Sequence, residues 1–299
     1  MRLKTNICGI DFKNPVIAAS GTFGFGSEFA EYIDIDKLGG ISSKGLTLNK
    51  NEGNSGIRIY ETPAGMMNSI GLQNPGIDHF IEHELVFMKE HSPVIIANLG
   101  GHSYDDYEIG ASKLDKTDVE MIELNISCPN LKEGGMAFGT DPKKAREVIR
   151  LVRNKTTKPL IVKLSPNVTH IAEFARIAQE EGADAISLVN TFNAMAIDIK
   201  RKKFVFDNKT AGLSGPAIKP IALRMTYEVI NAVDIPVIAM GGIVNTEDAL
   251  EFLMLGASAV QVGTANFANL DAMINIIDGL EKYCADNKID NIKEIIGIL

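Results

Sequence analysis

The chain has 299 residues, a formal net charge of −8 at pH 7 and a hydrophobic fraction of 45%. This length suits one large domain or two ordinary ones. The acidic balance argues against a nucleic-acid partner, which requires a basic face. The first residues lack the apolar core of a signal peptide, and no apolar run reaches the length of a membrane span. We therefore expect a cytoplasmic protein with no membrane association.

The cysteines of the chain, Cys8, Cys128 and Cys284, lie far apart and form no CxxC pair. Zinc sites and iron–sulfur clusters draw several thiolates from closely spaced motifs. We therefore expect neither a metal site nor an iron–sulfur cluster within this chain.

Short apolar runs recur along the chain and are mostly separated by helical patterns. They cover residues 16–19, 41–46, 94–99, 119–126, 160–164, 185–189, 235–240 and 259–262. The runs are continuous rather than alternating, which is typical of strands buried on both faces in a parallel sheet. An open doubly wound sheet shows the same alternation, but the number of strands favours a (β/α)8 TIM barrel. We expect a single domain over residues 1–299.

Other segments complete this predicted α/β architecture. Residues 2–12 alternate around Cys8 and Gly9, which predicts an N-terminal hairpin that caps one end of the fold. Helices are expected over 77–90, from Pro142, over 170–181, over 245–255 and up to about residue 284. A first long βα insertion, residues 47–75, is expected to be irregular and functional. A second long βα insertion follows Asn190 and Thr191 and contains residues 212–216.

Polar residues or glycines follow every predicted strand. They are Ser20, Lys44, Asn98, Asn125, Lys163, Asn190, the pair Gly241 and Gly242, and the pair Gly263 and Thr264. In a barrel these carboxyl ends meet at one face and build the active site. The glycines at residues 21–26 have GxxGxG spacing, a near miss to the dinucleotide fingerprint, so a tight loop beside a ligand is the favoured interpretation.

Glycines after the last two strands expose backbone N–H groups beside a helix start, the usual phosphate grip of this fold. A phosphate there implies a phosphorylated substrate or a cofactor such as FMN. Lys44 and Lys163 end apolar strands and must find an anion, because an unpaired buried lysine is costly. A reduced flavin offers one. A structural ion pair with a buried carboxylate, or a Schiff-base lysine, remains the alternative.

The sequence NISCPN, residues 125–130, ends a predicted strand with a thiol, a proline and two amides. Cys128 is a candidate catalytic residue by this position, although most free cysteines are small buried hydrophobes. Asn68, Asn125, Asn130 and Asn190 each present donors and acceptors, which suits a pyrimidine-like ring. Any one of these asparagines alone is better explained as a turn residue than as a ligand contact.

Taken together, these motifs resemble those of the dihydroorotate dehydrogenases. The resemblance is carried by NISCPN, by SSKG at 42–45, NSIGL at 68–72, VKLSPN at 162–167, GLSG at 212–215 and GGI at 241–243. It covers essentially the whole chain. A cysteine at the base position is similar to the soluble class 1 enzymes, and the loop LKEGGMAFGTDP, residues 131–142, resembles the NAD-linked class 1B form.

The resemblance implies a flavoprotein oxidoreductase of pyrimidine biosynthesis that oxidises dihydroorotate to orotate with Cys128 as base. It implies FMN contacts at Ser20, Lys44, Gly45, Asn98, Asn125, Lys163, Val189, Gly215, Gly241, Gly242, Gly263 and Thr264. It implies substrate contacts at Lys44, Asn68, Ser69, Ile70, Gly71, Leu72, Asn125, Asn130, Asn190 and Thr191, with Lys44 and the N–H groups of 69–72 on the carboxylate. The loop at 131–140 is expected to act as a lid.

The NAD-linked family further implies a partner, an electron-transfer subunit that carries FAD and a [2Fe–2S] cluster. The expected assembly is a heterotetramer around a homodimer of FMN chains, with an apolar patch near the flavin edge for the partner. Three alternatives stay open: a fumarate-linked class 1A enzyme, a tRNA-dihydrouridine synthase-like flavoenzyme, and a catalytically silent scaffold barrel.

Overall fold

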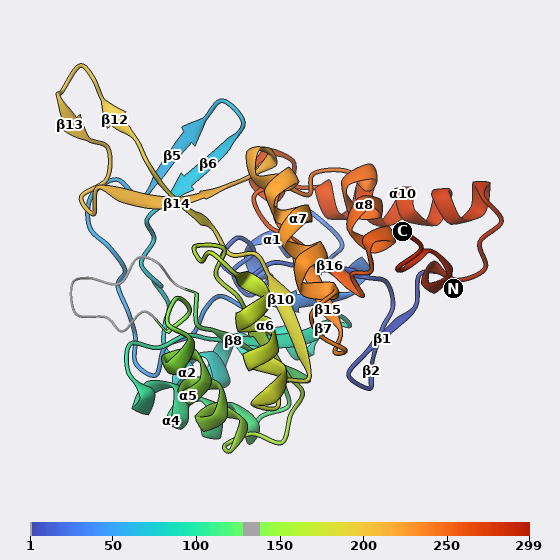
Figure 1. The fold of residues 1–299 in the computed structure, drawn as a ribbon, viewed down its shortest axis with the longest axis horizontal. Coiled ribbons are helices and arrows are strands. Elements are labelled where there is room, and N and C mark those ends of the chain that lie inside the picture. The colour runs from blue at the N-terminus through green and yellow to red at the C-terminus, as the bar shows by residue number, and fades with distance from the viewer. Residues whose placement is uncertain (1, 128–137) are drawn as a thin grey trace.

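The computed structural model describes residues 2–127 and 138–299. Its centre is a closed parallel barrel of eight strands in chain order around the ring (Figure 1). The strands are β3 (Val16–Ala18), β4 (Gly40–Ser42), β7 (Val94–Leu99), β8 (Met121–Asn125), β9 (Leu160–Lys163), β10 (Ala185–Leu188), β15 (Val237–Met240) and β16 (Ala259–Val262). The predicted (β/α)8 barrel is thus confirmed. Several strands are shorter than the predicted runs: β8 covers five residues of the run at 119–126, and in the run at 41–46 the strand β4 already ends at Ser42.

Helices surround the barrel (Figure 1). They are α1 (Ser27–Ala30), η1 (Ile35–Lys37), α2 (Ile77–His79), η2 (Phe80–Glu84), α3 (Leu85–Lys89), α4 (Tyr104–Asp115), α5 (Pro142–Arg153), α6 (Ile171–Glu180), η3 (Pro216–Ile218), α7 (Lys219–Ile230), α8 (Thr246–Leu255), α9 (Ala265–Ala268), α10 (Ala272–Asp286) and η4 (Ile292–Ile295). The predicted helix at 77–90 therefore contains a π-helical turn, η2. Among the residues that the structure describes, no helix is both long and apolar enough to cross a membrane.

The N-terminal hairpin has the predicted form. Strands β1 (Thr5–Ile7) and β2 (Ile10–Phe12) pair antiparallel across Cys8 and Gly9. Ile7 and Phe12 are buried in one apolar cluster with residues from the amino-terminal halves of the barrel strands, among them Ile17 and Met121. The hairpin thereby plugs the end of the barrel opposite the carboxyl ends of the strands.

The expectation that the first long insertion is irregular is wrong, and the second insertion contains strands as well. The first contains β5 (Ile59–Thr62) and β6 (Gly65–Asn68), and the second contains β11 (Phe192–Met195), β12 (Ile197–Asp198), β13 (Lys203–Phe204) and β14 (Thr210–Ser214). A separate antiparallel sheet in the order β11-β14-β6-β5 unites the two insertions. Its strands are short and contain glycine and polar residues, so an apolar-run criterion did not detect them. The insertions project together from one side of the barrel (Figure 1).

The inward-facing side chains of the barrel change from apolar to polar along the strands. Side chains of a strand alternate between its two faces, so residues two apart point the same way. Met121 and Ile161 lie in the apolar cluster beside the hairpin, and two residues further along the same strands come Glu123 and Lys163, both buried. The intervening Ile122 and Val162 pack outward in the main core with the helices. The interior thus consists of an apolar layer at the hairpin end and a polar layer toward the other end.

Candidate active site

A cavity of about 300 Å³ opens at the carboxyl ends of the barrel strands. Every residue for which an FMN contact is predicted lies on its wall: Ser20, Lys44, Gly45, Asn98, Asn125, Lys163, Val189, Gly215, Gly241, Gly242, Gly263 and Thr264. These residues come from distant parts of the sequence. The barrel topology therefore brings them to one place, as the positions at the strand ends indicated.

Most of the residues predicted to contact substrate share this cavity. Asn68, Ile70, Gly71, Leu72, Asn190 and Thr191 line it together with Lys44 and Asn125. Ser69 differs, because it is buried away from the described lining and its N–H donates to the carbonyl of Arg58 at 2.8 Å. That N–H is engaged within the chain, which assigns Ser69 to holding the insertion in place. Cys128 and Asn130 lie outside the described residues, as does most of the predicted lid at 131–140.

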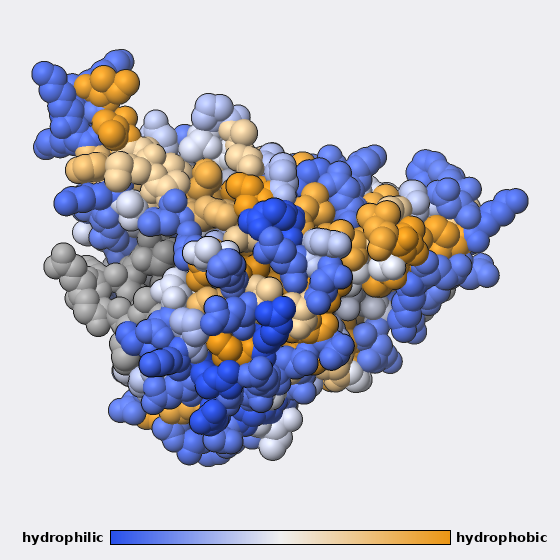
Figure 2. Space-filling model, viewed as in Figure 1, coloured by the Kyte–Doolittle hydropathy of each residue, from blue (hydrophilic) through white to orange (hydrophobic). Residues whose placement is uncertain are grey.

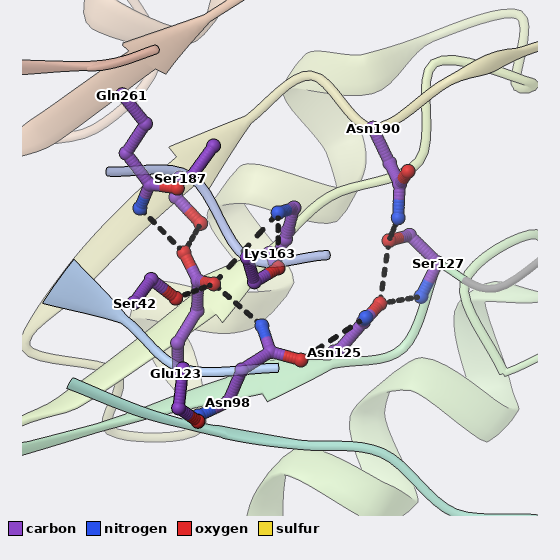
Figure 3. A network of polar contacts seen from close by, with 12 residues as sticks. Ser42, Asn98, Glu123, Asn125, Ser127, Lys163, Ser187, Asn190 and Gln261 are labelled. Atoms are coloured by element: carbon purple, nitrogen blue, oxygen red, sulfur yellow. Dashed lines mark hydrogen bonds and ion pairs between the residues drawn. The ribbon is translucent and has the colours of Figure 1, made fainter. Parts of the chain in front are cut away.

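Glu123 occupies the centre of the polar layer beneath the cavity (Figure 3). Its side chain is fully buried. One carboxylate oxygen, Oε1, accepts hydrogen bonds from Ser187 Oγ and Gln261 Nε2, each at 2.8 Å. The other, Oε2, accepts from Ser42 Oγ at 2.9 Å and from Asn98 Nδ2 at 2.5 Å. Donors from four different strands therefore converge on a single carboxylate.

Lys163 provides the opposite charge at the base of the cavity. Its Nζ atom lies 3.8 Å from Glu123 Oε2 and donates a hydrogen bond to Ser20 Oγ at 3.1 Å. Burial opposes ionisation of Glu123, but the charge of Lys163 and the surrounding donors outweigh it, so the pKa of this carboxyl is held below its ordinary value. The structural ion pair considered from the sequence is therefore present, and the lysine still reaches the cavity wall.

A chain of amides runs from Glu123 toward the cavity (Figure 3). Asn98 donates to Glu123, and its Oδ1 accepts from Asn125 Nδ2 at 3.3 Å. Asn125 Oδ1 accepts in turn from the backbone N–H and the hydroxyl of Ser127, at 3.2 and 2.8 Å. Asn190 Nδ2 donates to the same hydroxyl at 2.6 Å. The donors and acceptors thus run in a consistent direction along the chain.

One buried polar atom beside the cavity lacks a partner among the described residues. Gln261 donates through Nε2 to Glu123, whereas its Oε1 accepts no hydrogen bond. The residue is 1% exposed and lines the cavity. A buried acceptor without a donor is costly, so this atom is suited to an N–H or O–H group of a bound ligand.

Glycines shape the part of the cavity next to β15 and β16. Gly241 and Gly242 have φ values of 129° and 76°, which L side chains rarely adopt. A Cβ on Gly241 would come within 2.7 Å of Ala222 Cβ, and one on Gly242 within 2.8 Å of Lys219 Cβ. Only glycine fits this turn, and its backbone is therefore open to close approach by a ligand.

The two cysteines within the described residues have the properties of structural thiols. Burial, assisted by the charge of Asp184, raises the pKa of Cys8 to about 11, and its Sγ donates to the carbonyl of Asp184 at 3.2 Å. Burial likewise raises the pKa of Cys284, which is fully buried. Neither is a reactive thiolate near neutral pH.

Sequence reasoning missed the acidic centre of the polar layer and its supporting donors, namely Ser42, Glu123, Ser187 and Gln261. A signal for Glu123 was available. It is a carboxylate inside an apolar strand, and the argument applied to Lys163 holds equally for it. The serines and the glutamine carry no such signal, because neutral polar residues are common inside strands.

Comparison with known proteins agrees with this geometry. A family model described as dihydroorotate dehydrogenase matches residues 2–284. Three similar proteins are each named the catalytic subunit of dihydroorotate dehydrogenase B (NAD(+)). The one from Petrotoga mobilis is 61% identical and the alignment covers 99% of both chains. Those from Geotalea uraniireducens and Thermoanaerobacter pseudethanolicus are 53% and 52% identical, with 99% and 100% of this chain and 98% and 99% of the relatives covered.

Proposed function

Because the chain belongs to the dihydroorotate dehydrogenase family, we propose that it is the catalytic subunit of an NAD-linked enzyme that oxidises dihydroorotate to orotate in pyrimidine biosynthesis. The observation that carries the proposal is the cavity at the barrel mouth, where the buried Lys163 and the amides of Asn98, Asn125 and Asn190 converge. A positive charge below a set of two-way hydrogen-bonding amides suits a flavin together with a pyrimidine substrate.

The residues present fit FMN. The unpartnered Oε1 of Gln261 suits an N–H group of a flavin ring, and Lys163 suits the edge of the ring that gains negative charge. Gly241 and Gly242 leave the backbone open for a phosphate at the mouth of the barrel. FMN would be held by these residues together with Ser20, Lys44, Gly45, Asn98, Asn125, Val189, Gly215, Gly263 and Thr264.

When bound, FMN supplies an acceptor for the hydride that leaves C6 of dihydroorotate. Cys128 removes the proton from C5, a role for which a thiol near its ordinary pKa is suited once part of it is ionised. Lys163 stabilises negative charge that develops at the base of the cavity. Lys44 and the backbone at Ile70, Gly71 and Leu72 hold the substrate carboxylate, and Asn68, Asn125, Asn130, Asn190 and Thr191 hold the ring.

The insertion sheet completes the site above the barrel. Asn68 ends β6, and Ser214 ends the neighbouring β14; both line the cavity. Asn68 Nδ2 donates to the carbonyl of Gly212 at 3.4 Å, which ties the two insertions together beside the ligand. We assign to this sheet the exclusion of water from the reacting atoms.

We further propose that electrons reach NAD⁺ through a partner subunit that carries FAD and a [2Fe–2S] cluster. The only glycine cluster near a dinucleotide fingerprint, residues 21–26, has the wrong spacing, and its Gly21 lines the cavity proposed for FMN. Val244 and Phe267 line the cavity and are 37% and 50% exposed. Such apolar side chains beside the flavin site suit contact with an electron-transfer partner.

A second apolar surface lies on the projecting insertion. Ile197 and Phe204, on β12 and β13, are 59% and 46% exposed, and Figure 2 shows hydrophobic side chains at that projecting end. Two separate apolar surfaces match the two contacts of a heterotetramer, one with the electron-transfer subunit and one with a second copy of this chain.

The experiment that tests the proposed function is a visible spectrum of the purified chain, recorded before and after anaerobic addition of dihydroorotate. A flavin spectrum that bleaches on addition is expected. A colourless protein, or a flavin that dihydroorotate leaves oxidised, would overturn the proposal. NADH production by the isolated chain and by a complex with the electron-transfer subunit then tests the partner. We expect rapid NADH formation in the complex alone, and rapid formation by the isolated chain would remove the need for a partner.

A further inference from the structure

We propose that Glu123 is a positioning residue whose negative charge, acting with Lys163 and Asn98, sets the reduction potential of the flavin bound in the cavity. This inference rests on the proposed function, since it takes FMN as the ligand. It goes beyond that function by assigning a role to a side chain that lies below the cavity and is not among its described lining residues.

The first argument is the way in which the ion pair is built. Lys163 Nζ lies 3.8 Å from Glu123 Oε2, within range of strong electrostatic attraction but beyond hydrogen-bonding distance. Neutral donors occupy both carboxylate oxygens instead. The ammonium group of Lys163 therefore keeps its N–H groups for Ser20 and for the cavity, while the carboxylate balances its charge from behind.

The second argument is the direction that Glu123 imposes on the amides. A carboxylate can only accept hydrogen bonds, so Asn98 must turn its NH2 group toward Glu123 and its carbonyl toward Asn125. Asn125 must then offer its NH2 group to Asn98 and its carbonyl to Ser127. Asn98 and Asn125 both line the cavity. The orientation of their dipoles beside the ligand therefore follows from the acceptor that Glu123 presents to Asn98.

The third argument is the depth of the pair. Glu123 is fully buried and Lys163 is 4% exposed. Charges in such a site are weakly screened, so removing one of them changes the potential at the cavity far more than a surface substitution does. A pair of opposite charges with no net charge lies at the base of the cavity as the protein stands. Removal of the negative member leaves a net positive charge, which favours the more negative, reduced flavin.

The primary variant is Glu123→Gln, which removes the charge and keeps the shape. A carboxamide at this position retains an acceptor for Ser42 and Asn98, and Ser187 Oγ accepts one of its N–H groups. Its other N–H group requires Gln261 to reverse its amide, which turns Gln261 Oε1 away from the cavity, so the potential is measured on variant protein shown to retain FMN. We expect the FMN-bound variant to have a higher midpoint potential than the wild type. A change of about tenfold in the equilibrium constant for two-electron reduction corresponds to about 30 mV.

The matched control is Glu181→Gln. Glu181 is also a largely buried carboxylate in an ion pair, with Arg146 and Arg150, but it lies at the end of α6 on the outside of the barrel. Its substitution removes the same charge from the same residue type without reaching the cavity. The potential of this variant is expected to match that of the wild type. Equal potentials for the wild type, Glu123→Gln and Glu181→Gln would overturn the inference.

A second pair of variants covers the case in which Glu123→Gln does not fold. Lys163→Gln leaves a net negative charge below the cavity, and the double variant with Glu123→Gln leaves none. We expect a lower potential for Lys163→Gln and a return toward the wild-type value in the double variant. Identical potentials in these two variants would overturn the inference. If the wild type binds no FMN, the proposed function fails instead, and the two failures remain distinguishable.

Discussion

The two ends of the barrel interior are built from the same strands and differ in almost every physical respect. At the hairpin end, Met121, Ile161 and Ala259 pack with Ile7 and Phe12 in a buried apolar cluster. Two residues further along the same strands, the inward positions are Glu123, Lys163 and Gln261. One end gains stability from burial of apolar surface, whereas the other places charges where their desolvation is costly.

This difference shows that one end of the barrel interior supports stability and the other end forms the base of the cavity. A barrel needs a packed interior to be stable, and the apolar layer with its hairpin plug provides one from apolar side chains. The polar layer is fully buried as well, yet its geometry is directed at the cavity above it. The comparison predicts that substitutions at the hairpin end change stability alone and that substitutions at the cavity end change chemistry.

The largest effect is expected for Cys128→Ala. Loss of the base should slow anaerobic flavin reduction by dihydroorotate by about 10²–10⁴-fold while FMN stays bound. The matched control is Cys8→Ala at the hairpin end, where the pKa of the thiol is raised to about 11. Stopped-flow bleaching of the flavin measures both. A Cys128→Ala variant that bleaches at the wild-type rate would remove this residue from the mechanism.

The next effect belongs to the hairpin end. Phe12 is 1% exposed, and Phe12→Ala should lower the free energy of unfolding by about 3–5 kcal/mol through lost burial and a cavity. Urea denaturation measures this loss. Flavin reduction by the folded variant should remain at the wild-type rate, because Phe12 is separated from the cavity by the polar layer. A slowed reduction step would show that the two ends are coupled.

A smaller effect is expected for Ser187→Ala in the polar layer. Ser187 is fully buried and donates to Glu123 at 2.8 Å. Loss of a hydrogen bond to a buried charged group should cost about 1.5–3 kcal/mol of stability. Thr226→Ala is a suitable control, since Thr226 is equally buried and its hydroxyl has no hydrogen-bond partner among the described residues. Equal losses for the two variants would contradict a special role for the donors around Glu123.

The smallest effect concerns Asp36, near the hairpin end. Hydrogen bonds from the N–H of Ser92 and from His91 lower its pKa from 3.8 to about 2. A carboxyl whose pKa is lowered in the folded state stabilises the protein at pH values above its ordinary pKa. This contribution is lost as the pH falls from about 4 toward 2. Asp36 is partly exposed, so the contribution should stay below about 1 kcal/mol. Acid unfolding of Asp36→Asn should therefore begin from a lower stability but show less pH dependence over that range.

Much of this arrangement could be predicted from the sequence. The apolar runs predicted the barrel because strands buried on both faces must be continuous, and Ser20, Lys163 and Gly241 were found because each ends such a run. The insertion strands β5, β6, β11 and β14 could not be predicted in this way. β5 pairs locally with β6 and β11 locally with β14, but β14 pairs with β6 across more than a hundred residues of chain. The sheet as a whole therefore depends on tertiary contacts rather than on local pattern. Gln261 was missed for a related reason, since its role in the polar layer depends on its hydrogen bond to Glu123, which lies on another strand of the barrel.

The hairpin plug determines the route by which ligands reach and leave the cavity. With β1 and β2 sealing one end of the barrel, the described residues leave the cavity open only at the carboxyl ends of the strands, so ligands enter and leave on that side. Under the proposed function, orotate departs by the route that dihydroorotate takes in, so the product competes directly with the next substrate molecule. The electron acceptor is likewise kept from the end of the barrel that the hairpin covers. Under the proposed function, the partner subunit would accept electrons at the opening of the cavity without entering it.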